Sequence, residues 1–139
     1  DIEIVLMKEG RMGETYNACI KKAKGDILKF MGMDDYFHKP AALEKIATAF
    51  NSPQVYWLAT GCVHDTNGKL TDLHKPEWND RLYQGYNTVG GFATISLRNR
   101  DVPLIDEGLD WTVDVDWYWR IFLAHGTPHG PSRTTTPRC

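Results

Sequence analysis

The order of apolar runs and amphipathic stretches in this chain predicts an α/β fold. Two short apolar runs, residues 2–7 and 26–31, have the length of buried strands. Residues 14–23 and 41–50 follow these runs and place apolar side chains at helical spacing. Such alternation favours a sheet joined by right-handed crossovers, so we expect the two strands to be parallel neighbours with helices packed on the sheet.

Glycine and proline mark the ends of these first elements. Gly25 follows the first predicted helix and is a suitable C-cap. Pro40 stands at the start of the second predicted helix, where the first helical turn accepts proline. The loop between them, residues 32–39, therefore follows the carboxyl end of a strand, which is where open α/β sheets bind ligands.

The next part of the chain predicts a hairpin and a further strand. Asn67-Gly68 lies between two extended runs and is a strong hairpin signal. Gly90-Gly91 is a bend that leads into a predicted strand at residues 92–97. Paired glycines also allow a ligand to approach the backbone closely, so the bend is a candidate binding element.

Residues 113–125 predict a helix. Asp116 and Arg120 are spaced as i,i+4 partners on it. Its predicted inner stripe comprises Trp117, Ile121 and Ala124. The segment after it, residues 126–139, is rich in Pro, Thr and Gly and is expected to be irregular.

Length and composition limit the classes of protein to consider. The 139 residues are enough for one domain and one core. A formal net charge of −2 provides no global basic field, so we expect no nucleic-acid partner. The sequence contains no apolar run near the ~20 residues that span a bilayer and no signal-peptide pattern. Its 3 cysteines lack CxxC spacing, which argues against a disulfide framework and favours a cytoplasmic setting.

Asp34 and Asp35 are the first candidate for chemistry. Two adjacent carboxylates repel each other, so their position after a buried strand needs compensation. One interpretation is a turn, since aspartates favour loops and one of them could cap the next helix. The other is a shared Mg²⁺ or Mn²⁺ ion, which prefers oxygen ligands and would neutralise the pair.

Asp114 is the second candidate. It lies near the start of the helix predicted at residues 113–125 and could cap that helix, while Asp116 pairs with Arg120. If Asp114 faces a cleft, it could instead act as a general base. The residues alone leave both interpretations open.

Five motifs, taken in order, resemble the family 2 inverting glycosyltransferases, which have the GT-A nucleotide-sugar fold. They are "YNACIKKAKGD", "FMGMDDYFHKPAAL", "GCVHDTNGK", "GGFATISLRN" and "IDEGLDWTVDVDWYWR". The resemblance covers roughly residues 1–125. It implies a partial, Rossmann-like mixed sheet with flanking helices in three α/β/α layers.

The resemblance also implies a role for each matching residue. Asp114 matches the catalytic base, and Asp35 and Asp34 match the metal ligands for Mg²⁺ or Mn²⁺. The donor-binding positions are Asn17, Asp26 and Asp34. The acceptor-binding positions are Gly90, Gly91, Trp78 and Arg98. The implied partners are a nucleotide-sugar donor and a glycan or other hydroxyl acceptor.

The chain departs from the family pattern at three places. Gly32 replaces a frequent aspartate, and Val113 replaces a frequent acidic residue, which leaves Asp114 as the base candidate. The family's first strand and helix have no counterpart before Asp1, so residues 1–125 are expected to form an incomplete GT-A domain. A sheet without its first strand has an open edge, and we expect self-association through it.

The implied reaction is a direct displacement that inverts the anomeric carbon. The metal would stabilise the departing nucleoside diphosphate, and Asp114 would deprotonate the acceptor hydroxyl. Two alternatives remain open. One is a non-catalytic remnant of the same fold that binds nucleotide sugar or carbohydrate, and the other is a metal-dependent phosphohydrolase that uses the same carboxylates.

Overall fold

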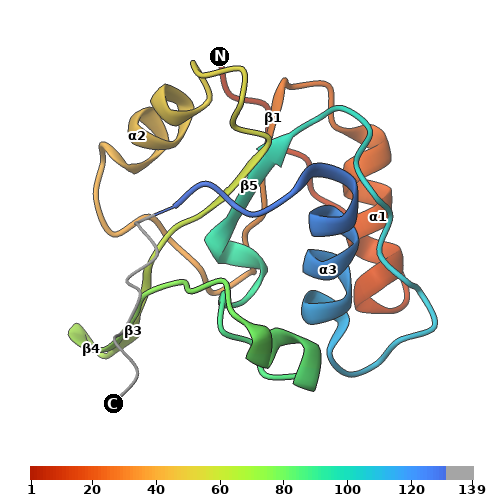
Figure 1. The fold of residues 1–139 in the computed structure, drawn as a ribbon. Helices are drawn as coiled ribbons and strands as arrows, with labels where there is room; N and C mark the ends of the chain where they lie inside the picture. Colours follow the sequence, from red (N-terminus) through yellow and green to blue (C-terminus); the bar gives the residue numbers. More distant parts are fainter. Residues whose placement is uncertain (131–139) are drawn as a thin grey trace.

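The computed structural model describes residues 1–130 and has a mixed α/β architecture (Figure 1). Its helices are α1 (Met12–Lys22), α2 (Ala42–Ala49) and α3 (Val113–His125), with short 3₁₀ turns η1 (Asp80–Gln84) and η2 (Phe92–Thr94). Its strands are β1 (Ile27–Lys29), β2 (Trp57–Ala59), β3 (Cys62–Thr66), β4 (Lys69–His74) and β5 (Ile95–Arg98). The α/β prediction is confirmed at this level.

The central sheet has the strand order β1-β5-β2, and both of its strand pairs are antiparallel. The predicted parallel pairing and the mixed sheet are therefore wrong for the described strands. The reason is that β1 pairs with β5, which comes nearly seventy residues later in the chain and runs in the opposite direction. Local alternation of helix and strand cannot reveal such a distant partner.

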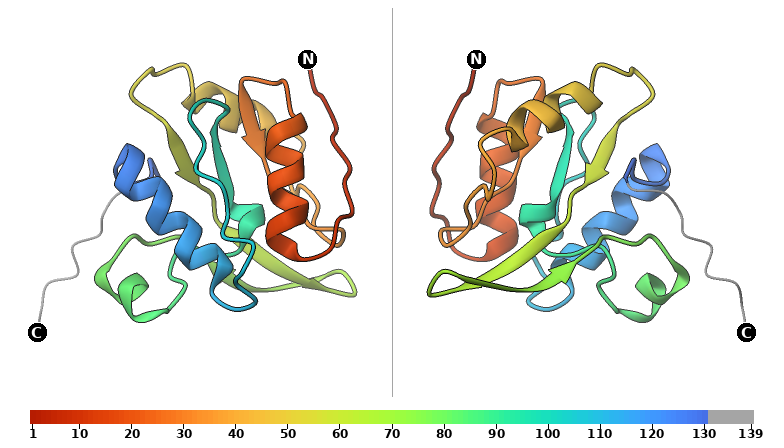
Figure 2. Two further views of the ribbon diagram at one scale, coloured as in Figure 1. Left: turned by 90° about the vertical axis from the view of Figure 1, so that its right-hand side faces the viewer. Right: turned by 90° about the vertical axis from the view of Figure 1, so that its left-hand side faces the viewer.

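Residues 2–7, predicted as the first strand, are not a strand. The segment runs along the outer side of α1 (Figure 2), and its side chains Ile2, Ile4 and Leu6 are exposed. The Lys24 N–H donates to Glu3 Oε2, which ties the segment to the end of α1 and not to a strand edge. Within residues 1–130 one edge of β1 stays open, so strand-like composition alone does not bring this segment to a strand edge.

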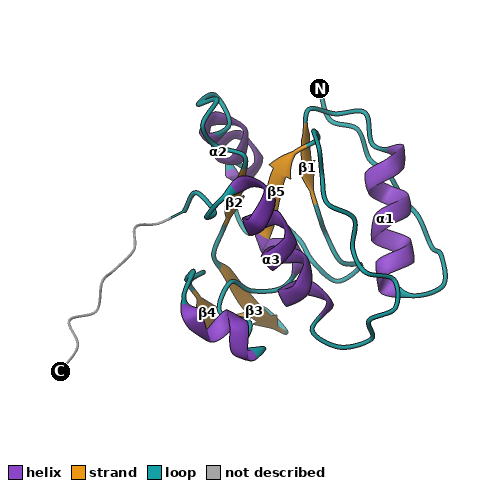
Figure 3. Cartoon of the chain, turned by 45° about the vertical axis from the view of Figure 1, so that its right-hand side comes forward, coloured by secondary structure: helices purple, strands orange, loops and turns teal. Residues whose placement is uncertain are grey.

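Helices cover both faces of the central sheet (Figure 3). On one face, α1 and α3 contribute Ile20, Trp117 and Ile121 to a core that includes Leu28 of β1 and Leu97 of β5. The face behind it packs against α2. There a smaller cluster contains Ile46, Phe50, Val55 and Leu58. Strand side chains alternate between the two clusters, as the period of a strand requires.

The hairpin signal at Asn67-Gly68 is confirmed. Strands β3 and β4 pair antiparallel, with Thr66 opposite Lys69. Both turn residues have positive φ, 54° for Asn67 and 83° for Gly68, as a tight two-residue hairpin turn requires. The hairpin extends away from the central sheet (Figure 2).

The helix predicted at residues 113–125 is confirmed as α3. Arg120 Nε donates to Asp116 Oδ2 at 2.6 Å, and its Nη2 donates to Asp106 Oδ2 at 3.1 Å. Trp117 and Ile121 are fully buried, but Ala124, predicted for the same stripe, is exposed. Ala124 lies in the last turn, beyond the sheet that the stripe covers.

The start of the segment predicted to be irregular packs beside β2. His129 forms an isolated parallel bridge with Leu58. Residues 131–139, the remainder of that segment, lie outside the described residues. Among the helices of residues 1–130, none is long and apolar enough to cross a membrane.

Candidate functional site at one end of the central sheet

The carboxyl end of β1 and the amino end of β5 lie at the same end of the central sheet. The register places Lys29 opposite Ser96 at this end, and Ile27 opposite Arg98 at the other. The loop that leaves β1 and the loop that enters β5 therefore meet here (Figure 1). These two loops contain the acidic pair and the glycine bend found in the sequence.

Asp34 and Asp35 follow β1 on an exposed loop. Asp35 Oδ2 accepts a hydrogen bond from the Gly32 N–H at 2.6 Å, which is a turn interaction typical of aspartate. Within residues 1–130, the remaining oxygens of the pair have no hydrogen-bond partner. The turn interpretation and the cation interpretation are therefore compatible at this position.

Asp114 lies in the first turn of α3 and is held by two hydrogen bonds. Its Oδ1 accepts from the Val115 N–H at 2.8 Å, and its Oδ2 accepts from Asn87 Nδ2. The N-cap of α3 is Thr112, with φ 55°, so Asp114 does not cap the helix. The carboxylate is partly exposed and is oriented by the loop before β5.

Asn87 joins Asp114 to the glycine bend. Its Oδ1 accepts from the N–H groups of Val89 at 3.0 Å and Gly90 at 2.8 Å. Its Nδ2 also donates to the Gly90 carbonyl at 2.9 Å, and the Tyr118 hydroxyl donates to the same carbonyl at 2.8 Å. Asp114 and the bend thus form one hydrogen-bonded unit.

Each of the two carboxylates affects the pKa of one tyrosine, Asp35 that of Tyr16 and Asp114 that of Tyr118. Burial and then the negative charge of Asp35 raise the pKa of Tyr16, while burial and then the charge of Asp114 raise the pKa of Tyr118 well above its usual value. Tyr16 stacks on Phe92 with ring centroids 4.3 Å apart, and Phe92 lies 6.2 Å from the Tyr118 ring. Tyr16, Phe92 and Tyr118 thus form one aromatic group, and each carboxylate acts electrostatically on one of its tyrosines.

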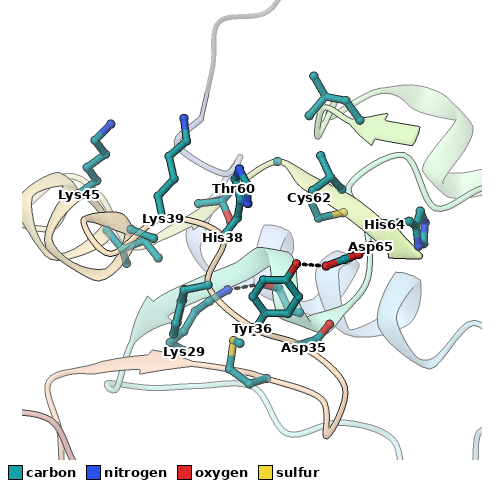
Figure 4. A pocket seen from close by; sticks show the side chains of 18 of the residues that line it. Lys29, Asp35, Tyr36, His38, Lys39, Lys45, Thr60, Cys62, His64 and Asp65 are labelled. Carbon is teal, nitrogen blue, oxygen red and sulfur yellow. Dashed lines mark hydrogen bonds between the residues drawn. The ribbon is translucent and has the colours of Figure 1, made fainter. Parts of the chain in front are cut away.

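A groove lies on the face of the sheet that α2 covers, and Figure 4 shows its side chains. This α2 groove is bounded by α2, by the loop at residues 34–41 and by the β3–β4 hairpin, and its volume is about 1080 Å³. Asp34 and Asp35 line it, but Asp114 does not. This groove therefore does not bring Asp35 and Asp114 together.

Lys29 lies on the floor of the α2 groove. Its Nζ donates to the Ala93 carbonyl, and the ion pairs found in residues 1–130 do not include it. Burial lowers its pKa to about 8, although the charge of Asp35 acts in the opposite direction. Lys29 is half-buried, and within residues 1–130 the Ala93 carbonyl is the hydrogen-bond acceptor found for its Nζ.

Asp26 and Arg98 lie at the far end of the sheet from this site. Asp26 precedes β1, and Arg98 ends β5. Arg98 donates to the carbonyls of Val55, Phe50 and Ser52 at 2.7–2.8 Å, so it secures the turn before β2. The fold does not bring these two predicted site residues to the acidic pair.

The side chains of Asn17 and Trp78 also make contacts within the core. The Asn17 side chain is buried and bonds Ile105 through both its amide nitrogen, at 2.9 Å, and its oxygen, at 2.8 Å. Trp78 packs edge-on against Trp57 and lies beside Phe122 of α3. Each side chain stabilises the contact between two segments of the core.

Sequence reasoning gave no role to Lys29 or to Asn87. Lys29 interrupts an apolar strand, and a charge inside such a run is a signal that could have been used. The position of Asn87 before the Gly90 bend was visible, but its bond to Asp114 joins residues 27 positions apart and has no local signature.

The acidic pair is suited to a metal ion that also takes a phosphate group as a ligand. Within the described part of the chain, no group of three or more His, Cys, Asp or Glu side chains could hold a metal ion. Mg²⁺ commonly takes only one or two carboxylates, with water and substrate phosphates as its other ligands. Asp34 and Asp35 offer such a partial set.

Comparison with models of protein families, with curated proteins and with solved structures found no match to this chain.

Proposed function

We propose that this chain is a GT-A-type glycosyltransferase that moves a sugar from a nucleoside-diphosphate donor to an acceptor hydroxyl with inversion. The observation that carries the proposal is the placement of two carboxylates at one end of the sheet, with Asp35 on the loop after β1 and Asp114 bonded through Asn87 to the bend before β5. A transferase of this kind needs one carboxylate at the leaving diphosphate and another at the attacking hydroxyl.

The finer fold assignment is part of the proposal. Helices on both faces of a sheet, and an acidic pair directly after one of its strands, support a GT-A domain. This support is an analogy at the level of the fold, and the sheet of residues 1–130 has only the three strands β1, β5 and β2. The function therefore has to be argued from the carboxylates and their surroundings.

Asp34 and Asp35 would hold Mg²⁺ or Mn²⁺ together with the donor diphosphate. Such an ion, when bound, supplies Lewis-acid stabilisation of the negative charge on the leaving group. The turn bond from the Gly32 N–H fixes the Asp35 carboxylate, and the exposed loop leaves its second oxygen accessible. Asp35 is the better oriented ligand of the two for this reason.

Asp114 would accept the proton of the acceptor hydroxyl as its oxygen attacks the anomeric carbon. The bond from that carbon to the diphosphate oxygen breaks in the same step, so the anomeric configuration inverts. Asn87 Nδ2 and the Val115 N–H orient the carboxylate before the acceptor arrives. Gly91 is exposed next to this unit and leaves room for the acceptor.

The test measures binding and turnover of UDP-glucose, UDP-N-acetylglucosamine and GDP-mannose with Mn²⁺ and a panel of sugar and alcohol acceptors. We expect release of nucleoside diphosphate, and we expect Asp114→Asn to lower the rate by ~10²–10⁴-fold with donor affinity nearly unchanged. Asp116→Asn is the matched control, because that carboxylate pairs with Arg120 one helical turn away.

The same assay separates the alternatives. Release of inorganic phosphate without an acceptor would favour the phosphohydrolase. Donor binding without turnover by the wild type would favour a non-catalytic binding domain. Equal rates for wild type and Asp114→Asn would contradict the assignment of the base.

A further inference from the structure

One of the five tryptophans is exposed and lies next to the proposed base in the chain. Trp111 is 85% exposed, which is unusual because tryptophan normally buries most of its large apolar ring. It precedes Asp114 by three residues, so the two Cα atoms lie within about 11 Å of each other, given about 3.8 Å between consecutive Cα atoms. The other four tryptophans are buried or partly buried: Trp57, Trp78, Trp117 and Trp119.

The segment that carries Trp111 is tied to α3 and has a defined backbone conformation. Arg120 of α3 donates a hydrogen bond from Nη2 to Asp106 Oδ2 at 3.1 Å. Thr112, between Trp111 and α3, has φ 55°, which is uncommon for a β-branched residue. Its hydroxyl donates to the Trp111 carbonyl at 2.7 Å. The exposed indole is therefore presented by an ordered segment at the start of α3.

An ion pair flanks this tryptophan. Asp110 precedes Trp111, and its Oδ1 lies 3.7 Å from Nη1 of Arg11, at the start of α1. Both side chains are more than half exposed, and the separation is longer than a good hydrogen bond, so each group can bind another partner. The surface thus combines a flat apolar ring with a neighbouring donor and a neighbouring acceptor.

We propose that Trp111 is the platform on which a sugar ring of the acceptor stacks, with its hydroxyls at Arg11 and Asp110. The proposal rests on the proposed function and narrows its acceptor from any hydroxyl compound to a sugar. A pyranose has C–H groups on one face and hydroxyls at its edge, so it can cover the indole and still hydrogen-bond, which a simple alcohol cannot do. Trp111 takes the role that the sequence suggested for Trp78, whose ring packs against the core.

The test is an NMR titration of the full chain, without donor, with the methyl glycosides of glucose, galactose, mannose and N-acetylglucosamine. The indole N–H signal of Trp111, assigned by its loss in Trp111→Phe, reports on the site. We expect at least one glycoside to shift this signal, with a dissociation constant in the millimolar range. Sorbitol, an open-chain polyol, is the matched ligand control and should leave the signal unchanged, because it has the hydroxyls but no ring face.

Three variants test the platform itself, with the Thr112 amide signal as the common reporter. Trp111→Ala should weaken glycoside binding by roughly tenfold or more, whereas Trp111→Phe keeps a flat ring and should lose less. Leu123→Ala, at an exposed apolar side chain near the other end of α3, is the control and should bind like wild type. All three side chains changed are exposed or replaced by a similar ring, so the fold is expected to be kept.

Three results would overturn the proposal: no shift with any glycoside, an equal shift with sorbitol, or wild-type affinity in Trp111→Ala. Because this titration needs no donor and no turnover, it separates the sugar site from the proposed function. Glycoside binding at Trp111 without transfer from any donor would contradict the transferase and leave the sugar site in place. Transfer to a sugar with the same acceptor KM in wild type and Trp111→Ala would support the transferase and contradict the Trp111 site.

Discussion

Gly90 has a backbone conformation that only glycine adopts without strain. Its φ is 113°, and a Cβ at this position would lie 2.7 Å from Thr94 Cγ2 and 3.2 Å from His74 Cδ2. Gly91, the next residue, has φ −68° and no atom within 4 Å of such a Cβ. Gly90 is thus required by its backbone conformation and by the lack of space for a Cβ, whereas neither constraint applies to Gly91.

We expect Gly90→Ala to destabilise the fold by roughly 1–3 kcal/mol, because it adds backbone strain and a steric clash. Gly91→Ala, the matched control, should change the free energy of unfolding by less than about 0.5 kcal/mol. Urea unfolding of both variants measures the difference. Equal stability of the two variants would mean that the bend does not have this conformation.

Lys29 makes stability depend on pH in a direction that can be worked out. Its pKa is about 8 in the folded state against 10.5 as its ordinary value, so between these values the unfolded chain binds more protons. The free energy of unfolding should therefore rise with pH in this window, and Lys29 contributes about 1–2 kcal/mol between pH 8 and 9.5. Burial raises the pKa of Cys19, which acts in the opposite direction.

Comparing how the free energy of unfolding of wild type and of Lys29→Met depends on pH separates the contribution of Lys29 from that of Cys19. Chemical unfolding at several pH values from 7 to 9.5 gives the two curves. We expect the free energy of unfolding of wild type minus that of the variant to rise with pH, since wild type gains stability that the variant cannot gain. Parallel curves would show that Lys29 keeps its ordinary pKa in the folded chain.

At the scale of elements, the Tyr36–Asp65 bond joins the loop after β1 to the β3–β4 hairpin. The Tyr36 hydroxyl donates to Asp65 Oδ2 across the α2 groove (Figure 4). This bond and the one from the Gly68 N–H lower the pKa of Asp65. This contact helps to hold the hairpin over the groove.

Removal of the Tyr36 hydroxyl should be visible at Asp65. Tyr36→Phe should raise the pKa of Asp65 toward its usual value, because a hydrogen bond to the charged form is lost while the Gly68 bond remains. Carbon-13 NMR titration of the aspartate carboxyls measures this. Tyr83→Phe, at an exposed tyrosine that packs on Trp119, should leave Asp65 unchanged. An unchanged Asp65 in Tyr36→Phe would show that loop and hairpin are not joined.

Elements whose signals are local could be predicted from the sequence. The helix at 113–125 has its periodicity and its Asp116–Arg120 pair within one segment, and the hairpin turn is specified by Asn67 and Gly68 alone. The pairing of β1 with β5 could not be predicted, because it joins segments far apart in the chain. Residues 2–7 have strand-like composition, but they do not pair with the open edge of β1, because composition does not determine which segments pair.

At the scale of the whole molecule, the sheet separates two regions. Asp114, Tyr16 and Tyr118 lie at the end of the face covered by α1 and α3. The face covered by α2 holds the groove with its lysines. Asp34 and Asp35 belong to the end of the sheet where the two faces meet. Their placement after a strand could be predicted, as could that of Asp26 at the opposite end of the same strand. The placement of Arg98 depends on the direction of β5, which the sequence did not reveal.

The central claim is that Asp34 and Asp35 hold a metal ion beside the bend and Asp114. Mn²⁺ broadens the NMR signals of nearby amides, so adding Mn²⁺ with UDP to the labelled chain measures where the ion lies. We expect signal loss to be strongest after β1 and at Gly90 and Gly91, to decrease along β5 toward Arg98, and to disappear in Asp35→Asn. Uniform broadening, or the same pattern in Asp35→Asn, would contradict the claim.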